Sequence, residues 1–217
     1  SSSGGGGGGG GGGVSVVAAE AAVAMAEILS VLQNSANGGY FYNLIQSKDI
    51  SVEYADLGDG INGMYFPTWW LDVGRCEVVI DCAENTIYLN SRLPVTYSWT
   101  AEAIATTLVH EAMHADYDHN TAVHAAETAA RLGVSSDDLS WYWDPVIDDY
   151  VLTDSQDQEF IAARQAVLLW EEVKGSQQNP QRDYQLALYQ MDEAGGSYLY
   201  ADVVSRYGGY PPYDRLH

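Results

Sequence analysis

The strongest constraint on the fold is a change in residue pattern near residue 98. Before this point, short segments alternate apolar and polar residues or are rich in β-branched and aromatic side chains, at residues 50–54, 63–66, 78–80 and 86–89. After it, apolar residues recur at spacings of three and four, which is typical of helices. Strands followed by helices, without regular alternation, predict an α+β fold in which a small antiparallel or mixed sheet precedes a mostly helical C-terminal half.

Capping residues, glycines and prolines place the ends of the individual elements. Residues 78–80 and 86–89 flank a turn and predict a hairpin, and Ser98 or Thr100 can cap the first helix of the second half. Residues 155–158 fit a capping box, whereas residues 135–154 are expected to be irregular. The predicted helices cover residues 15–33, 40–47, about 100 onward, 121–132, 155–174, 182–193 and 197–207.

The chain begins with a low-complexity leader. Residues 1–13 are three serines followed by ten glycines, which predict a flexible tether, and residues 14–217 have the length of one domain. Cys76 and Cys82 flank a predicted strand and match no redox or zinc-ribbon motif. The absence of an initial Met, the polar leader and the two lysines favour a secreted, extracellular protein.

The charge balance excludes several partners. Nine Lys and Arg residues against 30 Asp and Glu residues give a net charge of −21, and such a surface repels phosphate backbones and anionic lipid. The most apolar run, residues 14–31, contains Glu20 and Glu27, which argues against a membrane-spanning helix. These glutamates are seven residues apart and share one face of a helix, so we expect the opposite face to pack in the core. We therefore expect no nucleic acid partner and no membrane insertion.

The segment with the most specific chemistry is His110-Glu111-Ala112-Met113-His114. Residues four apart lie on one face of a helix, so His110 and His114 can reach the same metal ion. Two imidazole nitrogens suit Zn²⁺ in a tetrahedral site. Glu111 projects beside them without taking a ligand position and can accept the proton of the attacking water. This pattern predicts zinc as cofactor and Glu111 as general base.

A catalytic zinc site normally has a third protein ligand, for which Glu159 is the best candidate. It precedes a series of apolar residues at spacings of four, seven, eight and eleven, namely Ala163, Ala166, Val167 and Trp170, which places it on the inward face of its helix. An unpaired buried carboxylate is costly, so a cation is its natural partner. The alternative is a glutamate in the first helical turn with its carboxylate in solvent.

Other residues near the motif compete for the same role. His124 and Glu127 form an H-x-x-E pair on the next predicted helix, and His119 is close in sequence. Asp116 and Asp118 could orient the histidines, but we expect them to be solvated. A hydrogen bond to a tetrahedral oxyanion could come from one of three tyrosines, for which aromatic packing is the alternative role: Tyr117, Tyr142 and Tyr150.

A strand hairpin, an H-E-x-x-H helix and a later Glu-bearing helix resemble the gluzincin group of zincin metallopeptidases and little-characterised bacterial domains of that kind. The resemblance spans about residues 50–174 and rests on residues 87–90 (IYLN), 108–115 (LVHEAMHA) and 158–162 (QEFIA). It implies that His110, His114 and Glu159 bind zinc and that Glu111 is the general base. Where thermolysin-like members have an Asp that steadies a ligand histidine, this chain has Ala163.

Two hypotheses about function follow. The first is a zinc-dependent metallopeptidase acting on a peptide or protein, which could lie along residues 86–89 as an added strand. The second is a structural or self-assembling extracellular protein that retains a zincin-like fold. In that case the polyglycine leader, the Ala-rich first helix and the 16 tyrosines would support a homo-oligomer or filament through the N-terminal region.

Overall fold

The computed structural model describes residues 23–67, 84–132, 135, 141–144, 149–152, 155–191 and 197–206. The predictions for the leader, for the strand at residues 78–80 and for Cys76 and Cys82 lie outside these residues. Within them the fold is α+β, mostly helical, with a small three-stranded mixed sheet.

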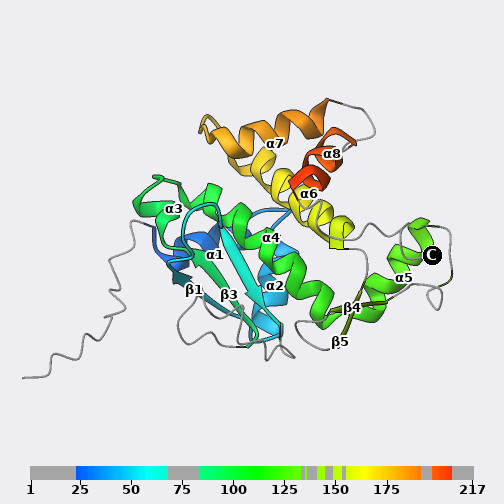
Figure 1. Cartoon of the computed structure of the whole chain (residues 1–217). Helices are drawn as coiled ribbons and strands as arrows, with labels where there is room; N and C mark the ends of the chain where they lie inside the picture. The colour runs from blue at the N-terminus through cyan, green and yellow to red at the C-terminus, as the bar shows by residue number, and fades with distance from the viewer. Residues whose placement is uncertain are drawn as a thin grey trace, which may run out of the picture.

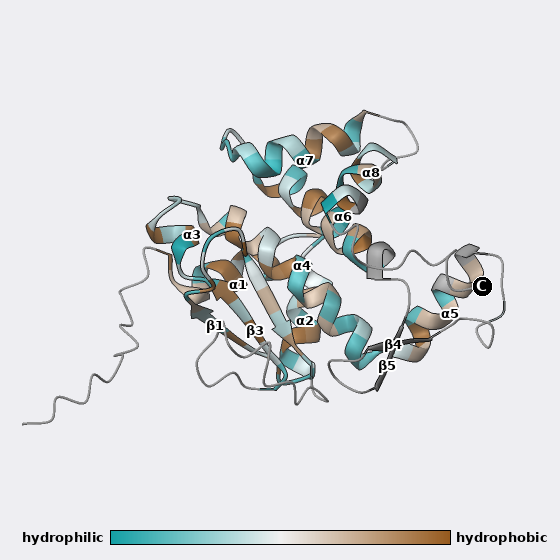
Figure 2. Ribbon diagram, in the orientation of Figure 1, coloured by the Kyte–Doolittle hydropathy of each residue, from teal (hydrophilic) through white to brown (hydrophobic). Residues whose placement is uncertain are grey.

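The helix α4 (Ala101–His119) runs through the middle of the molecule, as Figure 1 shows. The sheet and the first two helices lie on one side of it, and the C-terminal helices lie on the other. Thr100, one of the two caps that the sequence allowed, caps α4 by accepting a hydrogen bond from the backbone N–H of Ala103. The buried residues of α4 occupy several of its faces, and Figure 2 shows hydrophobic and hydrophilic residues mixed along it. A helix of this kind can carry polar groups inside the core.

The N-terminal helices α1 (Met25–Gln33) and α2 (Gly39–Ser47) pack against α4 and contribute to its main hydrophobic cluster. The ends at Gln33 and Ser47 are as predicted, but a helix that includes Val23 and Ala24 is wrong. Ala24 is extended, and the carbonyl of Val23 accepts a hydrogen bond from the Tyr54 hydroxyl at 3.2 Å. This hydrogen bond favours the non-helical conformation of Val23 and Ala24, and the helix begins at Met25.

The sheet consists of β1 (Ser51–Ala55), β2 (Gly63–Phe66) and β3 (Thr86–Asn90), in the order β1-β3-β2. The strand β3 lies between the other two, parallel to β1 and antiparallel to β2. Every residue of β3 is buried. An added peptide strand along β3 is therefore excluded, since both of its edges are already paired.

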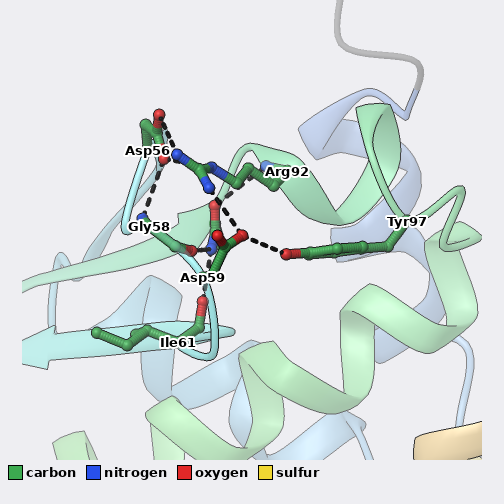
Figure 3. A network of polar contacts seen from close by, with 7 residues as sticks. Asp56, Gly58, Asp59, Ile61, Arg92 and Tyr97 are labelled. Atoms are coloured by element: carbon green, nitrogen blue, oxygen red, sulfur yellow. Dashed lines mark hydrogen bonds and ion pairs between the residues drawn. The ribbon is translucent and has the colours of Figure 1, made fainter.

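The loop between β1 and β2 is fixed by polar contacts from the end of β3 and from the chain that follows it. Arg92, at the start of the short helix α3 (Arg92–Val95), forms ion pairs with Asp56 at 2.7 Å and Asp59 at 2.8 Å, and Asp59 also accepts a hydrogen bond from Tyr97 (Figure 3). The Asn90 amide donates to two loop carbonyls, at 2.7 and 2.6 Å. These contacts fix the loop, and the loop in turn fixes the position of β2 beside α4.

The second hydrophobic cluster joins α4 to α6 (Ser155–Val173), α7 (Pro180–Gln190) and α8 (Ser197–Arg206). Trp170 is fully buried in it, and Ala163 and Val167 lie on the same face of α6, as the apolar spacing predicted. The helix α5 (Thr121–Leu132) follows α4 with the predicted bounds. None of the described helices is long and apolar enough to cross a lipid bilayer.

The expected irregular segment at residues 135–154 contains a hairpin of β4 (Trp141–Asp144) and β5 (Asp149–Leu152). These strands pair in antiparallel register. Both are four residues long, too short for their alternation to stand out among the surrounding aspartates.

Candidate metal centre

The structure brings His110, His114 and Glu159 together between α4 and α6. Glu159 Oε2 lies 3.2 Å from His110 Nε2, and Glu159 Oε1 lies 3.4 Å from His114 Nε2. One ligand atom from each residue lies within 4.8 Å of the others, and all three side chains are partly buried. Glu159 has only 12% of its side chain exposed, so the solvent-exposed alternative for this glutamate is wrong.

The donor set and the two distances from Glu159 fit a tetrahedral zinc ion. Bonds of about 2.0–2.1 Å at tetrahedral angles place neighbouring ligand atoms about 3.3 Å apart. The two distances from Glu159 to the histidine nitrogens bracket this value. Two histidines and one carboxylate also form a common ligand set of catalytic zinc sites, in which a fourth position remains open.

Glu159 and His114 shift each other's pKa. Burial opposes the charge on His114, but Glu159, through its charge and hydrogen bond, and Glu111 outweigh it and raise the pKa of His114 to about 9. Burial likewise opposes ionisation of Glu159, yet the neighbouring histidines lower the pKa of this carboxyl. A cation between these groups would replace the proton on His114 as the partner of the carboxylate.

Glu111 lies beside this group and is itself only 8% exposed. Burial and the negative charge of Glu159 raise the pKa of Glu111, whereas the positive charges of His110, His114 and Arg182 act in the opposite direction. The net effect is a raised pKa. A carboxylate with a raised pKa is better matched to proton transfer near neutral pH than an ordinary surface glutamate.

Two neighbours of Glu111 were not found by sequence reasoning. Gly63, at the start of β2, lies against the Glu111 side chain, and Arg182 from α7 hydrogen-bonds Thr107 on α4 at 2.8 Å. Arg182 is 4% exposed and also donates to Gln185. Neither residue belongs to a recognisable motif, and both reach the site only through the packing of distant elements.

The expectation that Asp116 is solvated is wrong. Asp116 is 3% exposed and accepts hydrogen bonds from Tyr40 at 2.8 Å, Asn120 at 2.6 Å and His124 at 2.7 Å. Burial opposes ionisation of Asp116, but these donors outweigh it and lower its pKa. His124 is therefore engaged with Asp116 and does not belong to the group formed by His110, His114 and Glu159.

Replacing Asp116 with alanine should destabilise the fold by about 3 kcal/mol, because it leaves the buried His124, and the partly buried hydrogen bonds from Tyr40 and Asn120, without their acceptor. The free energy of unfolding, measured in urea, tests this. Asp59→Asn is the control, since Asp59 also accepts hydrogen bonds but is 83% exposed, and it should change stability much less than Asp116→Ala. Equal costs for the two variants would contradict the assignment of Asp116 as a buried link between helices.

The other candidates near the motif have contacts of their own. Asp118 accepts a hydrogen bond from Tyr65 at 2.7 Å, and His119 Nε2 lies 2.8 Å from the side-chain oxygen of Asn85. Tyr117 stacks on His124 with ring centroids 4.1 Å apart, in agreement with a packing role. The side chains of the remaining oxyanion candidates, Tyr142 and Tyr150, lie outside the described part of the structure.

Comparison of the chain with known protein families, with curated proteins and with solved structures found no match. The functional assignment therefore rests on the geometry and chemistry of the site itself.

Proposed function

We propose that the chain is a zinc-dependent metallopeptidase of the gluzincin type. The observation that carries this proposal is the convergence of His110 and His114 from α4 with Glu159 from α6, beside the buried carboxylate of Glu111. His110, His114 and Glu159 would hold the ion. Zinc, when bound, supplies a Lewis acid that polarises the scissile carbonyl and makes water a better nucleophile.

The chain's own residues supply proton transfer and positioning. Glu111 takes a proton from the attacking water and returns it to the amine that leaves when the peptide bond breaks. Burial raises the pKa of Glu111, which makes its carboxylate a stronger base than that of an ordinary surface glutamate. Gly63 on β2 lies against Glu111 and Thr107, and Thr107 accepts a hydrogen bond from Arg182.

The substrate class in this proposal is a peptide or an unfolded protein, and secretion of the enzyme is part of the same proposal. The alternative of a self-assembling protein depends on the leader and on the first part of the predicted N-terminal helix, which lie outside the described residues. It stays a prediction.

The purified protein, saturated with Zn²⁺ and then desalted, should retain about one ion per chain, measured by elemental analysis. It should hydrolyse fluorescently labelled, unstructured casein, and a chelator such as 1,10-phenanthroline should abolish this activity until zinc is restored. A protein that retains no zinc would contradict the ligand assignment. A protein that retains zinc at these residues without cleaving any peptide of a diverse library would contradict the peptidase assignment.

A further inference from the structure

The strand β2 meets α4 most closely at Gly63. A Cβ atom built on this residue would lie 2.8 Å from Glu111 Cγ, 2.9 Å from Thr107 Cγ2 and 3.1 Å from Glu111 Oε1. Contacts this short do not occur between carbon atoms in packed proteins. The backbone of β2 therefore closes directly on the side chain of Glu111, in a space that only glycine leaves open.

The requirement for glycine here is one of space and not of backbone conformation. The described glycines with positive φ are Gly58, Gly60 and Gly175, and Gly63 is not among them. Gly63 instead pairs with Leu89 in the regular antiparallel register of β2 and β3. An alanine could adopt this backbone, so its cost would come from the side chains that it meets.

Neither side of this contact can move away easily. Thr107 is 1% exposed and its hydroxyl accepts a hydrogen bond from Arg182, while Glu111 is 8% exposed. On the other side, pairing with β3 fixes β2, and the preceding loop is held by the contacts of Asn90 and Arg92.

We propose that Gly63 is a positioning residue for Glu111: its missing side chain lets β2 hold the Glu111 carboxylate beside the group formed by His110, His114 and Glu159. The inference rests on the proposed function in assigning a catalytic consequence to this contact. The backbone of β2 at Gly63 limits the rotamers that the Glu111 side chain can adopt. A methyl group at position 63 would push this carboxylate out of its place, since its three nearest atoms belong to Glu111 and Thr107 and to none of the candidate ligands.

Gly63→Ala should lower kcat for casein-derived peptides by about 10- to 100-fold, because a displacement of the order of 1 Å at a proton-transferring group has effects of this size. The KM and the zinc content should stay as in the unmodified protein. The melting temperature should fall by about 5 °C from overpacking. Gly39→Ala is the matched control, since a Cβ at Gly39 meets nothing within 4 Å, and it should change none of these quantities appreciably.

A double-mutant cycle separates the contact with Glu111 from other effects. In a Glu111→Ala background, the fall in melting temperature caused by Gly63→Ala should be at least halved, with the methyl group of Thr107 causing the rest.

The inference is overturned if Gly63→Ala leaves kcat unchanged, or if its effect on the melting temperature is the same with and without the Glu111 side chain. The melting temperatures need no enzymatic activity. A chain that cleaves no peptide but shows the expected coupling would contradict the proposed function while retaining the steric contact, so the two failures are distinguishable.

Discussion

Glu111→Gln should abolish peptide hydrolysis, lowering kcat/KM by about a thousandfold, while the protein keeps about one zinc ion per chain. Glutamine has nearly the same shape as glutamate and fills the space between Gly63 and Thr107, but its amide cannot accept the proton of the attacking water. The candidate ligands are untouched by the change. Loss of activity without loss of metal would therefore assign proton transfer to this carboxylate.

The melting temperature of Glu111→Gln should equal or exceed that of the unmodified protein, because burial penalises the charged form of this carboxyl and raises its pKa. Glu53→Gln is the matched control, since Glu53 is an exposed glutamate on β1. It should retain full activity. If Glu111→Gln cleaved peptides at the unmodified rate, Glu111 would not be the general base.

Glu159→Ala should weaken zinc binding by at least about a hundredfold, because it removes the only carboxylate of the candidate ligand set. The two histidines remain on α4 but cannot complete the site. Competition with a fluorescent zinc chelator measures the affinity, and Glu171→Ala, an exposed glutamate on the same helix, serves as control. If Glu159→Ala bound zinc with unchanged affinity, Glu159 would not be the third ligand.

The same variant should change how the stability of the metal-free protein depends on pH. Because Glu159 raises the pKa of His114 from 6.5 to about 9, their ion pair stabilises the fold fully below pH 6.5 and loses this contribution as the pH rises through about 9. The lowered pKa of Glu159 adds stability that is lost only in acid. Melting temperatures measured in a chelator should therefore fall between pH 6.5 and 9.

In Glu159→Ala this fall should disappear, because His114 no longer has its nearest carboxylate and burial then disfavours its protonation. The pH dependence of the imidazole proton signals in NMR spectra gives the pKa directly. A decline in stability of the same size in the variant would assign it to a different titrating group.

Sequence reasoning was most successful where local physics determines the outcome. The cap at Thr100, the periodic apolar residues of α4 and the position of Glu159 on the apolar face of α6 are properties of single segments. These properties also place His110 and His114 on one face. They do not say which helix faces meet, and for that the structure was needed.

The missed features all depend on contacts between distant segments. The parallel pairing of β1 and β3 is decided by the packing of the whole sheet, and Asp116 is buried only because α2 and α5 close over it. Arg182 reaches Thr107 across 75 residues of sequence. No residue pattern within one segment predicts these contacts. From its residue type alone, Asp116 was therefore expected to be a solvated surface residue.

The placement of the candidate ligands on two helices determines which part of the molecule must open to release an ion. His110 and His114 lie within the central helix α4, whose amides should exchange with solvent only when the whole domain unfolds. Glu159 lies in the second turn of α6, ahead of the residues that anchor this helix in the core. Fraying of that end alone would separate carboxylate from imidazoles, so ion release would need only a local, low-energy opening.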